Sequence, residues 1–202
     1  FFFFKQKTAY EIPKRDWSSD VCSSDLKLIP TGELIYANRK SFIEKFLGHF
    51  IPIYKELTQG KETPGLQYDS HLSEGNFADI LYQNHRIDST AQRTTMGVHK
   101  YELQFNLDGL PLKKFGSQGQ IKSYIIALKL AQYRYFQSVT QKCPLLLLDD
   151  IFEKIDADRA QRLIEMVGES NFGQILITDT HPSRVETHFS SIKAEKVHHH
   201  IG

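Results

Sequence analysis

Two adjacent aspartates, Asp149 and Asp150, directly follow a run of four leucines, residues 145–148. An apolar strand that ends in a carboxylate holds that group at the edge of a dry core. There the first aspartate can bind Mg²⁺, directly or through water, beside a nucleotide's phosphates. The second can orient or deprotonate an attacking water. A single aspartate at a strand end is more often a simple cap, but the acid pair after four leucines favours phosphate chemistry.

A second polar stretch, Ser117-Gln118-Gly119-Gln120, precedes an apolar-striped segment. If a helix begins here, its first amides and its positive end face an arriving anion. The glycine permits close approach of the backbone, and the serine hydroxyl can donate a hydrogen bond. The stretch is equally compatible with a simple capped turn. Its place upstream of the Asp-Asp strand makes a phosphate site the more specific interpretation.

The segments that must position these residues read as a strand, a helix and a second strand. The leucine run does not alternate with polar residues, which predicts a strand buried on both faces, as in a parallel sheet. Asp156 can cap a helix that runs to about Val167, and residues 174–178 give the next buried strand. Such a βαβ unit gathers its functional groups at the carboxyl ends of its strands, where the twin aspartates and residues 178–181 fall.

Four further elements are predicted upstream. An apolar stripe at helical spacing predicts a long amphipathic helix over residues 32–57. Alternation favours a strand over residues 66–72, and Asn76 is a plausible cap for the helix that follows it. Residues 100–112 are typical of a β-hairpin that turns at Asp108 and the glycine after it.

Bulk composition sets only loose bounds on function. The 202 residues are 40% hydrophobic and 24% charged, which suits one globular domain or a large part of one. The net charge of +1 argues neither for nor against nucleic acid. Two cysteines, Cys22 and Cys143, form no disulfide framework, so we expect a cytoplasmic location. The longest apolar runs are too short to cross a membrane.

Residues 1–26 differ in character from the rest of the chain. They begin with four phenylalanines and continue without helical or strand periodicity. The stretch resembles a translated sequencing adapter, and we therefore expect residues 1–26 to be an artefact outside the fold. The alternative is a natural, poorly ordered leader.

Together these motifs resemble the C-terminal half of an ABC-type ATPase of the SMC and RecF group, most closely the RecF family. Residues 117–120 resemble its Ser-x-Gly-Gln signature, and the leucine run with its two acids resembles a Walker B strand. Residues 153–156 resemble its D-loop. The turn TTMGVHK, residues 94–100, is similar to a family turn that precedes a hairpin. The resemblance covers about residues 27–189.

The resemblance implies an α/β fold: the C-terminal half of an ABC-type (P-loop NTPase) lobe with a helical arm subdomain. Residues 27–95 would form the arm, and residues 96–202 would form the part of the lobe. ATP and Mg²⁺ would be sandwiched in a homodimer. The signature residues that would contact the γ-phosphate of ATP held by the partner subunit are Ser117, Gln118, Gly119 and Gln120.

The remaining site residues also follow from the resemblance. Asp149 would bind Mg²⁺, and Asp150 would be the catalytic carboxylate. Asp156 would lie at the dimer interface near both nucleotides. His181 would be the switch residue that senses the γ-phosphate, although it stands two residues later than the family's spacing. The two residues before it, Asp179-Thr180, are therefore alternatives for that position.

Two features depart from the family's pattern. Tyr101 precedes Glu102 where the family usually has an acid pair. No P-loop of the form G-x-x-x-x-G-K-S/T occurs in the sequence, and the family places that loop near its N-terminus. We interpret the chain as a fragment that carries the half-site acting in trans. Alone, it is expected to bind ATP poorly and to hydrolyse little, whereas the intact parent would be a weak ATPase.

The resemblance also implies a role in DNA replication, recombination and repair. The family binds DNA at single-strand/double-strand junctions and loads recombinase with recombination-mediator proteins. Arg93, Lys100, Lys113 and Lys114 are the basic residues expected to contact DNA phosphates. Solvated surface charge is an equally good interpretation of these four residues.

Two other functions are compatible with the same residues. The first is a Mg²⁺-dependent phosphohydrolase or nuclease that uses Asp149 and Asp150. It would need further acids at strand ends, for which Asp179 is the strongest candidate, and it leaves the signature stretch unexplained. The second is a dimerisation or DNA-binding module that keeps the lobe without hydrolysis.

Overall fold

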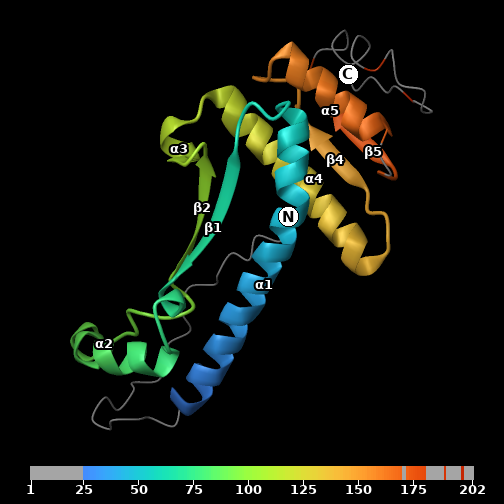
Figure 1. The fold of residues 1–202 in the computed structure, drawn as a ribbon. Coiled ribbons are helices and arrows are strands. Elements are labelled where there is room, and N and C mark those ends of the chain that lie inside the picture. The colour runs from blue at the N-terminus through green and yellow to red at the C-terminus, as the bar shows by residue number, and fades with distance from the viewer. Residues whose placement is uncertain (1–24, 170–171, 181–188, 190–196, 198–202) are drawn as a thin grey trace. The chain divides into compact units, whose positions relative to one another are not determined.

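The computed structural model describes residues 25–169, 172–180, 189 and 197. In chain order the elements are α1 (Asp25–Leu57), β1 (Pro64–Ser70), the 3-10 turn η1 (His71–Ser73), α2 (Phe77–Ala91), β2 (Tyr101–Leu107), β3 (Leu110–Pro111), α3 (Leu112–Phe115), α4 (Gln118–Thr140), β4 (Leu146–Asp149), α5 (Ala157–Glu169) and β5 (Ile175–Thr178) (Figure 1). The predicted α/β class is confirmed.

The helices upstream of the signature follow the predictions with shifted ends. Helix α1 begins at Asp25 and continues through both of its prolines, Pro30 and Pro52. Helix α2 begins after Asn76, whose Oδ1 accepts a hydrogen bond from the amide of Ala78 at 2.7 Å. The cap predicted from the sequence is therefore confirmed. Most of the expected artefact, residues 1–24, lies outside the described residues, so that prediction is not tested.

The predicted hairpin is present, but its second strand is short. Strands β2 and β3 pair antiparallel, and Asp108 and Gly109 form the turn with φ angles of 50° and 78°. An Asp-Gly pair suits such a turn because both positions need positive φ. Strand β3 has only two residues because Leu112 already begins α3. Strand β1 completes a three-stranded sheet in the order β1-β2-β3.

The predicted βαβ unit is confirmed in topology. Strands β4 and β5 pair parallel, with α5 between them in sequence. Leu147 lies opposite Leu176 in the register, and Asp149 lies opposite Thr178. The carboxyl ends of both strands therefore meet at one edge of this sheet.

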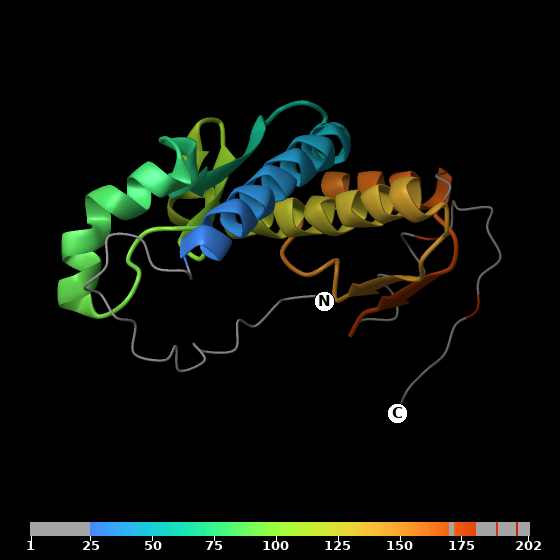
Figure 2. The ribbon, with the colours of Figure 1, turned by 90° about the horizontal axis from the view of Figure 1, so that it is seen from below.

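The prediction that the leucine strand, β4, is buried on both faces is wrong, and the strand after it, β5, is also exposed on one face. Leu146 and Leu148 are 6% and 1% exposed, but Leu147 and Leu176 are 57% and 55% exposed. Helices α4 and α5 cover the face that carries Leu148, and Figure 2 shows both helices on one side of the strands. The other apolar face has no covering element in the described part of the chain, which explains the high exposure.

Helix α4 carries the signature residues at its start and packs into two apolar clusters. Ile126 and Leu130 join the cluster formed with β4 and α5. Tyr124 joins the second cluster, in which its ring lies 4.8 Å from Phe50 and its hydroxyl donates to the carbonyl of Gly65 at 2.6 Å. Because α4 is anchored on both sides, its N-terminal turn has a defined position relative to β4 and α5.

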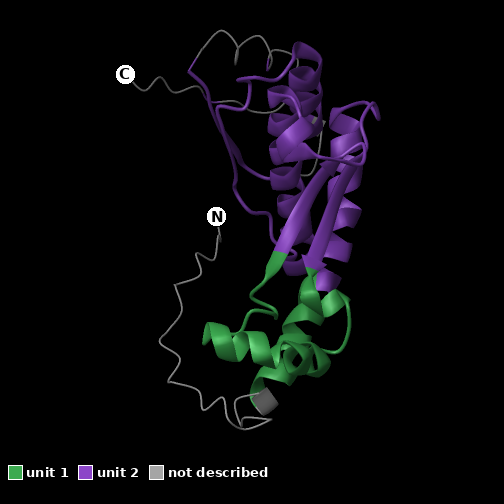
Figure 3. Cartoon of the chain, turned by 90° about the vertical axis from the view of Figure 1, so that its left-hand side faces the viewer, with its two compact units in different colours: residues 1–39, 70–101 green, residues 40–69, 102–202 purple. Residues whose placement is uncertain are grey.

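The chain divides into two compact units, which Figure 3 shows in green and purple. Unit 1 comprises residues 1–39 and 70–101, and unit 2 comprises residues 40–69 and 102–202. Within unit 1, Arg39 donates from Nη1 to the carbonyl of Val98 at 2.7 Å. Unit 2 contains α3, α4, α5, β3, β4 and β5, and thus nearly all the predicted site residues. None of the helices in the described ranges is long and apolar enough to cross a membrane.

Candidate functional site

The signature turn, residues 117–120, lies at the mouth of α4 as predicted. Ser117 is the N-cap, and its Oγ accepts a hydrogen bond from the amide of Gln120 at 3.2 Å. In return, Gln120 Oε1 accepts from the amide of Ser117 at 2.8 Å, which completes a capping box. The capping box does not use the amides of Gln118 and Gly119, which are the other donors of the first turn. The predicted capped turn and the predicted anion-facing helix end are therefore compatible.

Gly119 allows the signature turn to lie against the D-loop segment, residues 153–156. A Cβ at Gly119 would lie 3.1 Å from the backbone oxygen of Lys154, which is closer than nine in ten real contacts of a Cβ atom. Lys154 itself has a positive φ of 65°. The absence of a side chain at Gly119 thus serves close packing of two backbone segments within the chain.

The aspartate edge, formed by Asp149 and Asp150, lies at the carboxyl end of β4 as predicted. The hydroxyl of Thr178, at the end of β5, donates a hydrogen bond to Asp149 Oδ1. Asp150 has a positive φ of 48°, and its amide donates to the carbonyl of Thr178 at 3.0 Å. Lys122 on α4 donates from Nζ to the carbonyl of Asp150 at 2.8 Å. Both neighbouring elements therefore hold the turn that presents the second carboxylate.

The oxygen atoms at this edge fit part of a magnesium site. Mg²⁺ commonly takes one or two carboxylates and completes its octahedron with water and substrate phosphates. Asp149 supplies such a carboxylate, with the hydroxyl of Thr178 beside it. The described residues contain no group of three or more His, Cys, Asp or Glu side chains that could hold a metal ion. The described residues at this edge therefore supply only part of the coordination shell that a metal ion needs.

A charged residue that the sequence did not single out, Arg159 on α5, joins several site segments. Its Nη2 lies 2.7 Å from Glu62 Oε1, and its Nε lies 3.0 Å from Asp156 Oδ2. Its Nη1 donates to Ser123 Oγ at 3.0 Å, one turn into α4. The hydroxyl of Ser123 in turn donates to the carbonyl of Gly119 at 2.8 Å. Every nitrogen of the guanidinium group therefore has an oxygen acceptor.

Glu62, in the loop before β1, accepts the other hydrogen bonds of this network. The hydroxyl of Tyr54 donates to its Oε2 at 2.5 Å, and Gln120 donates from Nε2 to its Oε1 at 3.1 Å. Glu62 is only 8% exposed. The side chain of Gln120 therefore bridges the capping box and a buried carboxylate.

The ionisation of the network follows from these contacts. Burial acts to raise the pKa of the Glu62 carboxyl, but hydrogen bonds from Tyr54, Gln120 and Arg159 outweigh burial and hold the pKa below its ordinary value. Burial, together with the hydrogen bond to Glu62 and its charge, raises the pKa of Tyr54. At neutral pH, Glu62 is therefore an anion and Tyr54 a neutral donor.

Two further predicted residues have different outcomes. Asp156 caps α5 as predicted, because its Oδ1 accepts from the amide of Arg159 at 2.9 Å. His181 lies outside the described residues, and its proposed role as a switch stays a prediction. Asp179 and Thr180, the alternatives for that position, directly follow β5.

The four predicted DNA-contacting residues are all exposed, but they belong to different units. Lys113 and Lys114 lie next to each other on α3 in unit 2. Arg93 and Lys100 lie between α2 and β2 in unit 1. The structure therefore describes each pair within its own unit, and the DNA-binding assignment stays a prediction.

The fold of unit 2 is that of one class of architecture. A parallel βαβ unit, a strand ending in Asp-Asp, a capped signature turn and an adjoining D-loop segment match the parts of an ABC-type ATPase lobe. Within that class the chain is similar to RecF. It is 43% identical over 155 residues to "DNA replication and repair protein RecF" of Bacteroides thetaiotaomicron and to the protein of that name from Flavobacterium johnsoniae.

Other comparisons agree with this assignment. The RecF protein of Phocaeicola vulgatus is 40% identical over 165 residues, which cover 81% of this chain and 44% of that protein. Among solved structures, one described as "recombination mediator protein RecF-ATP in RecFOR pathway" superposes with a TM-score of 0.62 at 21% identity. That match covers 77% of this chain and 43% of the solved chain, and it supports the same fold. No family model matches the chain.

The similarity covers most of this chain but only part of each relative. The matches to the first two RecF proteins cover 77% of this chain, but only 42% and 43% of those proteins. The chain thus spans less than half the length of the curated relatives it matches, in line with the predicted C-terminal RecF fragment.

Proposed function

We propose that the chain forms the trans-acting half-site of a RecF-type ATPase that works in DNA replication and repair. The observation that carries the proposal is that helix α4, which begins with the signature turn, contacts both the D-loop segment and the turn of Asp150 within unit 2. The signature turn touches the D-loop segment at Gly119, and Lys122 on the same helix holds the turn of Asp150. A nucleotide sandwich requires this combination of surfaces on one subunit.

In this function each motif has a chemical role. The unused amides of the signature turn and the Ser117 hydroxyl bind the γ-phosphate of ATP on the partner subunit. Asp149 supplies one Mg²⁺ ligand, and Asp150 orients the attacking water on its own subunit's ATP. Asp156 lies at the dimer interface. The metal, when bound, neutralises charge that develops on the phosphates.

The exposed apolar face of β4 and β5 supports the proposal that further chain completes the lobe. Leu145, Leu147 and Leu176 are each more than half exposed. Contiguous apolar surface of this kind usually lies against another part of a protein. The part of a RecF-type protein that carries the P-loop is the natural cover for this face.

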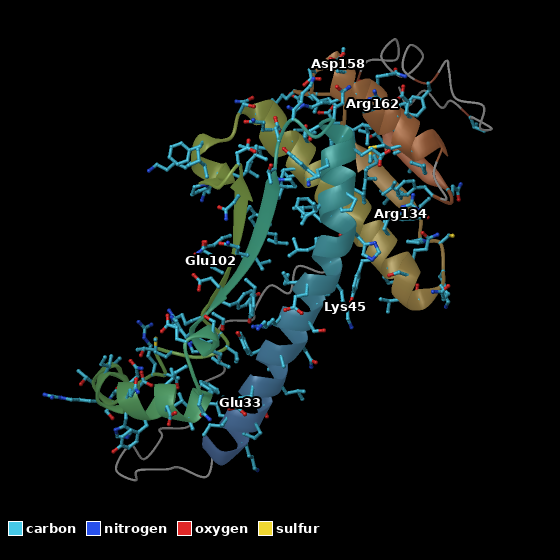
Figure 4. The ribbon with its side chains drawn as sticks, in the orientation of Figure 1. Glu33, Lys45, Glu102, Arg134, Asp158 and Arg162 are labelled. Atoms are coloured by element: carbon cyan, nitrogen blue, oxygen red, sulfur yellow. The ribbon has the colours of Figure 1, made fainter. Side chains whose placement is uncertain are left out.

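Replacing Asp150 in a complete protein that carries these residues tests the proposal. The Asp150→Asn variant is expected to bind ATP, to lose hydrolysis and to accumulate as an ATP-bound dimer. Size-exclusion chromatography with light scattering measures the dimer. Asp158→Asn, an exposed position on α5 labelled in Figure 4, is the matched control and should behave like the wild type. A wild type that neither binds ATP nor dimerises with it contradicts the proposal.

Two other functions would give different results with the same variant. A nuclease would lose DNA cleavage without forming an ATP-dependent dimer. A scaffold without hydrolysis would be unchanged in both assays. The Asp150→Asn variant therefore separates all three functions.

DNA binding, recombination-mediator partners and a cytoplasmic location belong to the same proposal. DNA contact at Lys113 and Lys114 is testable by charge reversal in the complete protein. Changing both to Glu should weaken DNA affinity more at low salt than at high salt, because phosphate contacts release counterions. An unchanged affinity at low salt removes these two residues from the DNA footprint.

A further inference from the structure

The structure links the signature turn and the D-loop segment by a second route besides backbone contact. Arg159 bonds Asp156 of the D-loop segment and, on its other side, Glu62. Glu62 in turn accepts from Gln120 of the signature turn. One buried carboxylate and one guanidinium group thus connect two segments that both face the proposed dimer interface.

The geometry of this link is specific to arginine. Its planar fork offers donors in fixed directions, and here separate nitrogens meet Glu62, Ser123 and Asp156. A lysine offers a point charge on a flexible stem and cannot reproduce this fork. The link therefore holds α4 and the segment before α5 together by charge attraction. It also fixes their relative orientation.

The burial of the charged Glu62 carboxylate also argues that Glu62 and Arg159 have a positioning role. Buried ion pairs often stabilise a fold no more than well-packed apolar side chains, because removing the two charges from water is costly. A pair that is nevertheless charged and fully bonded, with a buried carboxylate and a half-buried guanidinium group, is well suited to fixing one geometry. Glu62 at 8% exposure, with bonds from Tyr54, Gln120 and Arg159, meets this description.

We infer that Glu62 and Arg159 are positioning residues that couple the signature turn to the D-loop segment, so that ATP-driven dimerisation meets both in one fixed arrangement. The inference rests on the proposed function. Neither residue touches ATP in this account. Both act through Gln120 and Asp156, which form part of the trans surface.

The test uses a complete protein with these residues in place and compares two isosteric or conservative variants. Glu62→Gln keeps the shape and removes the charge, and Arg159→Lys keeps the charge and removes the fork. Arg162→Ala is the matched control, because Arg162 lies one turn further along α5 in an exposed pair with Glu165 at 3.1 Å (Figure 4). Thermal unfolding first establishes that each variant is folded.

Two affinities distinguish positioning from a general structural role. The first is the affinity of the dilute monomer for ATP, which depends on the P-loop side and should stay within about twofold of the wild type. The second is the dissociation constant of the ATP-bound dimer, which should weaken about tenfold in both variants, within the usual range of coupling between sites. ATP turnover at a fixed protein concentration should fall in parallel. Arg162→Ala should change none of these quantities.

Each other outcome has a defined meaning. If both variants dimerise and turn over ATP like the wild type, the inference is overturned while the proposed function stands. If monomer affinity for ATP falls as much as dimerisation, the two residues are only structural and the inference is again overturned. If the wild type itself does not dimerise with ATP, the proposed function fails and the inference fails with it.

Discussion

The signature turn and the aspartate edge lie in the same unit but are held in contrasting ways. The signature turn is enclosed by its own capping box, by the bond from Gln120 to Glu62 and by the backbone of Lys154. The aspartate edge ends a sheet whose second face is open, as the 57% exposure of Leu147 shows. In the proposed function, the turn that acts on a partner's nucleotide is held by contacts within unit 2, whereas the edge that faces its own nucleotide has fewer such contacts.

The two faces of β4 should differ most in how much stability is lost when a leucine is shortened to alanine. Leu148→Ala should lower the free energy of unfolding by about 3 kcal/mol, because it opens a cavity in the cluster with α4 and α5. Leu147→Ala, on the open face, should cost less than about 1 kcal/mol in this chain. Urea unfolding of both variants measures the difference. Equal losses would show that the second face is covered in solution.

The next comparison is the loss of stability when either of two arginines on α5, the bonded Arg159 or the exposed Arg162, is replaced by alanine. Arg159→Ala should destabilise the fold by about 3 kcal/mol, because it leaves Glu62 buried without its cation. Arg162→Ala should change stability by no more than about 0.5 kcal/mol, since its side chain is 48% exposed. Urea unfolding at neutral pH provides the comparison. Similar values for the two variants would contradict the proposed network.

A smaller effect is expected at the cap of the signature helix. Ser117→Ala removes the acceptor for the amide of Gln120 and should cost about 1 kcal/mol. Ser117→Asp keeps a side-chain acceptor and should recover most of this loss. Thermal unfolding followed by circular dichroism measures both. A Ser117→Ala variant as stable as the wild type would mean that the capping box does not form.

The smallest effect is a dependence of stability on pH. The folded-state pKa of Glu62 lies below its unfolded value of 4.5. Its contribution is therefore present above about pH 4.5 and is lost as the pH falls through the lower folded pKa. As the pH falls below about 4.5, the free energy of unfolding should fall more steeply for the wild type than for Glu62→Gln. Parallel slopes would indicate that the pKa of Glu62 is not lowered by folding.

Much of the architecture could be predicted because its signals are local. The cap at Asn76, the turn at Asp108 and the cap at Ser117 each depend on a few neighbouring residues. The aspartate edge could be predicted because an apolar run ending in two acids determines both the strand and its polar end.

The features that sequence reasoning missed depend on distant partners. Glu62 and Arg159 are 97 positions apart, and no local pattern marks Glu62 as buried. The spacing of Asp156 and Arg159 does suggest an i,i+3 pair, which was the available signal for that part of the network. The burial of β4 on only one face also could not be predicted. Four leucines are compatible with burial on both faces, but actual burial depends on which elements of the chain cover the strand.

The proposed function depends on contact between the signature turn and ATP held by another subunit, and directed cross-linking can detect that contact. Complete proteins would be mixed so that one protomer carries Ser117→Cys with an inactivated P-loop, and the other keeps an intact P-loop and Ser117. An ATP analogue with a thiol-reactive group on its γ-phosphate would then be added. If the signature turn acts in trans, the first protomer is labelled only when the second is present. Labelling that requires a P-loop in the same protomer as the cysteine would contradict action in trans.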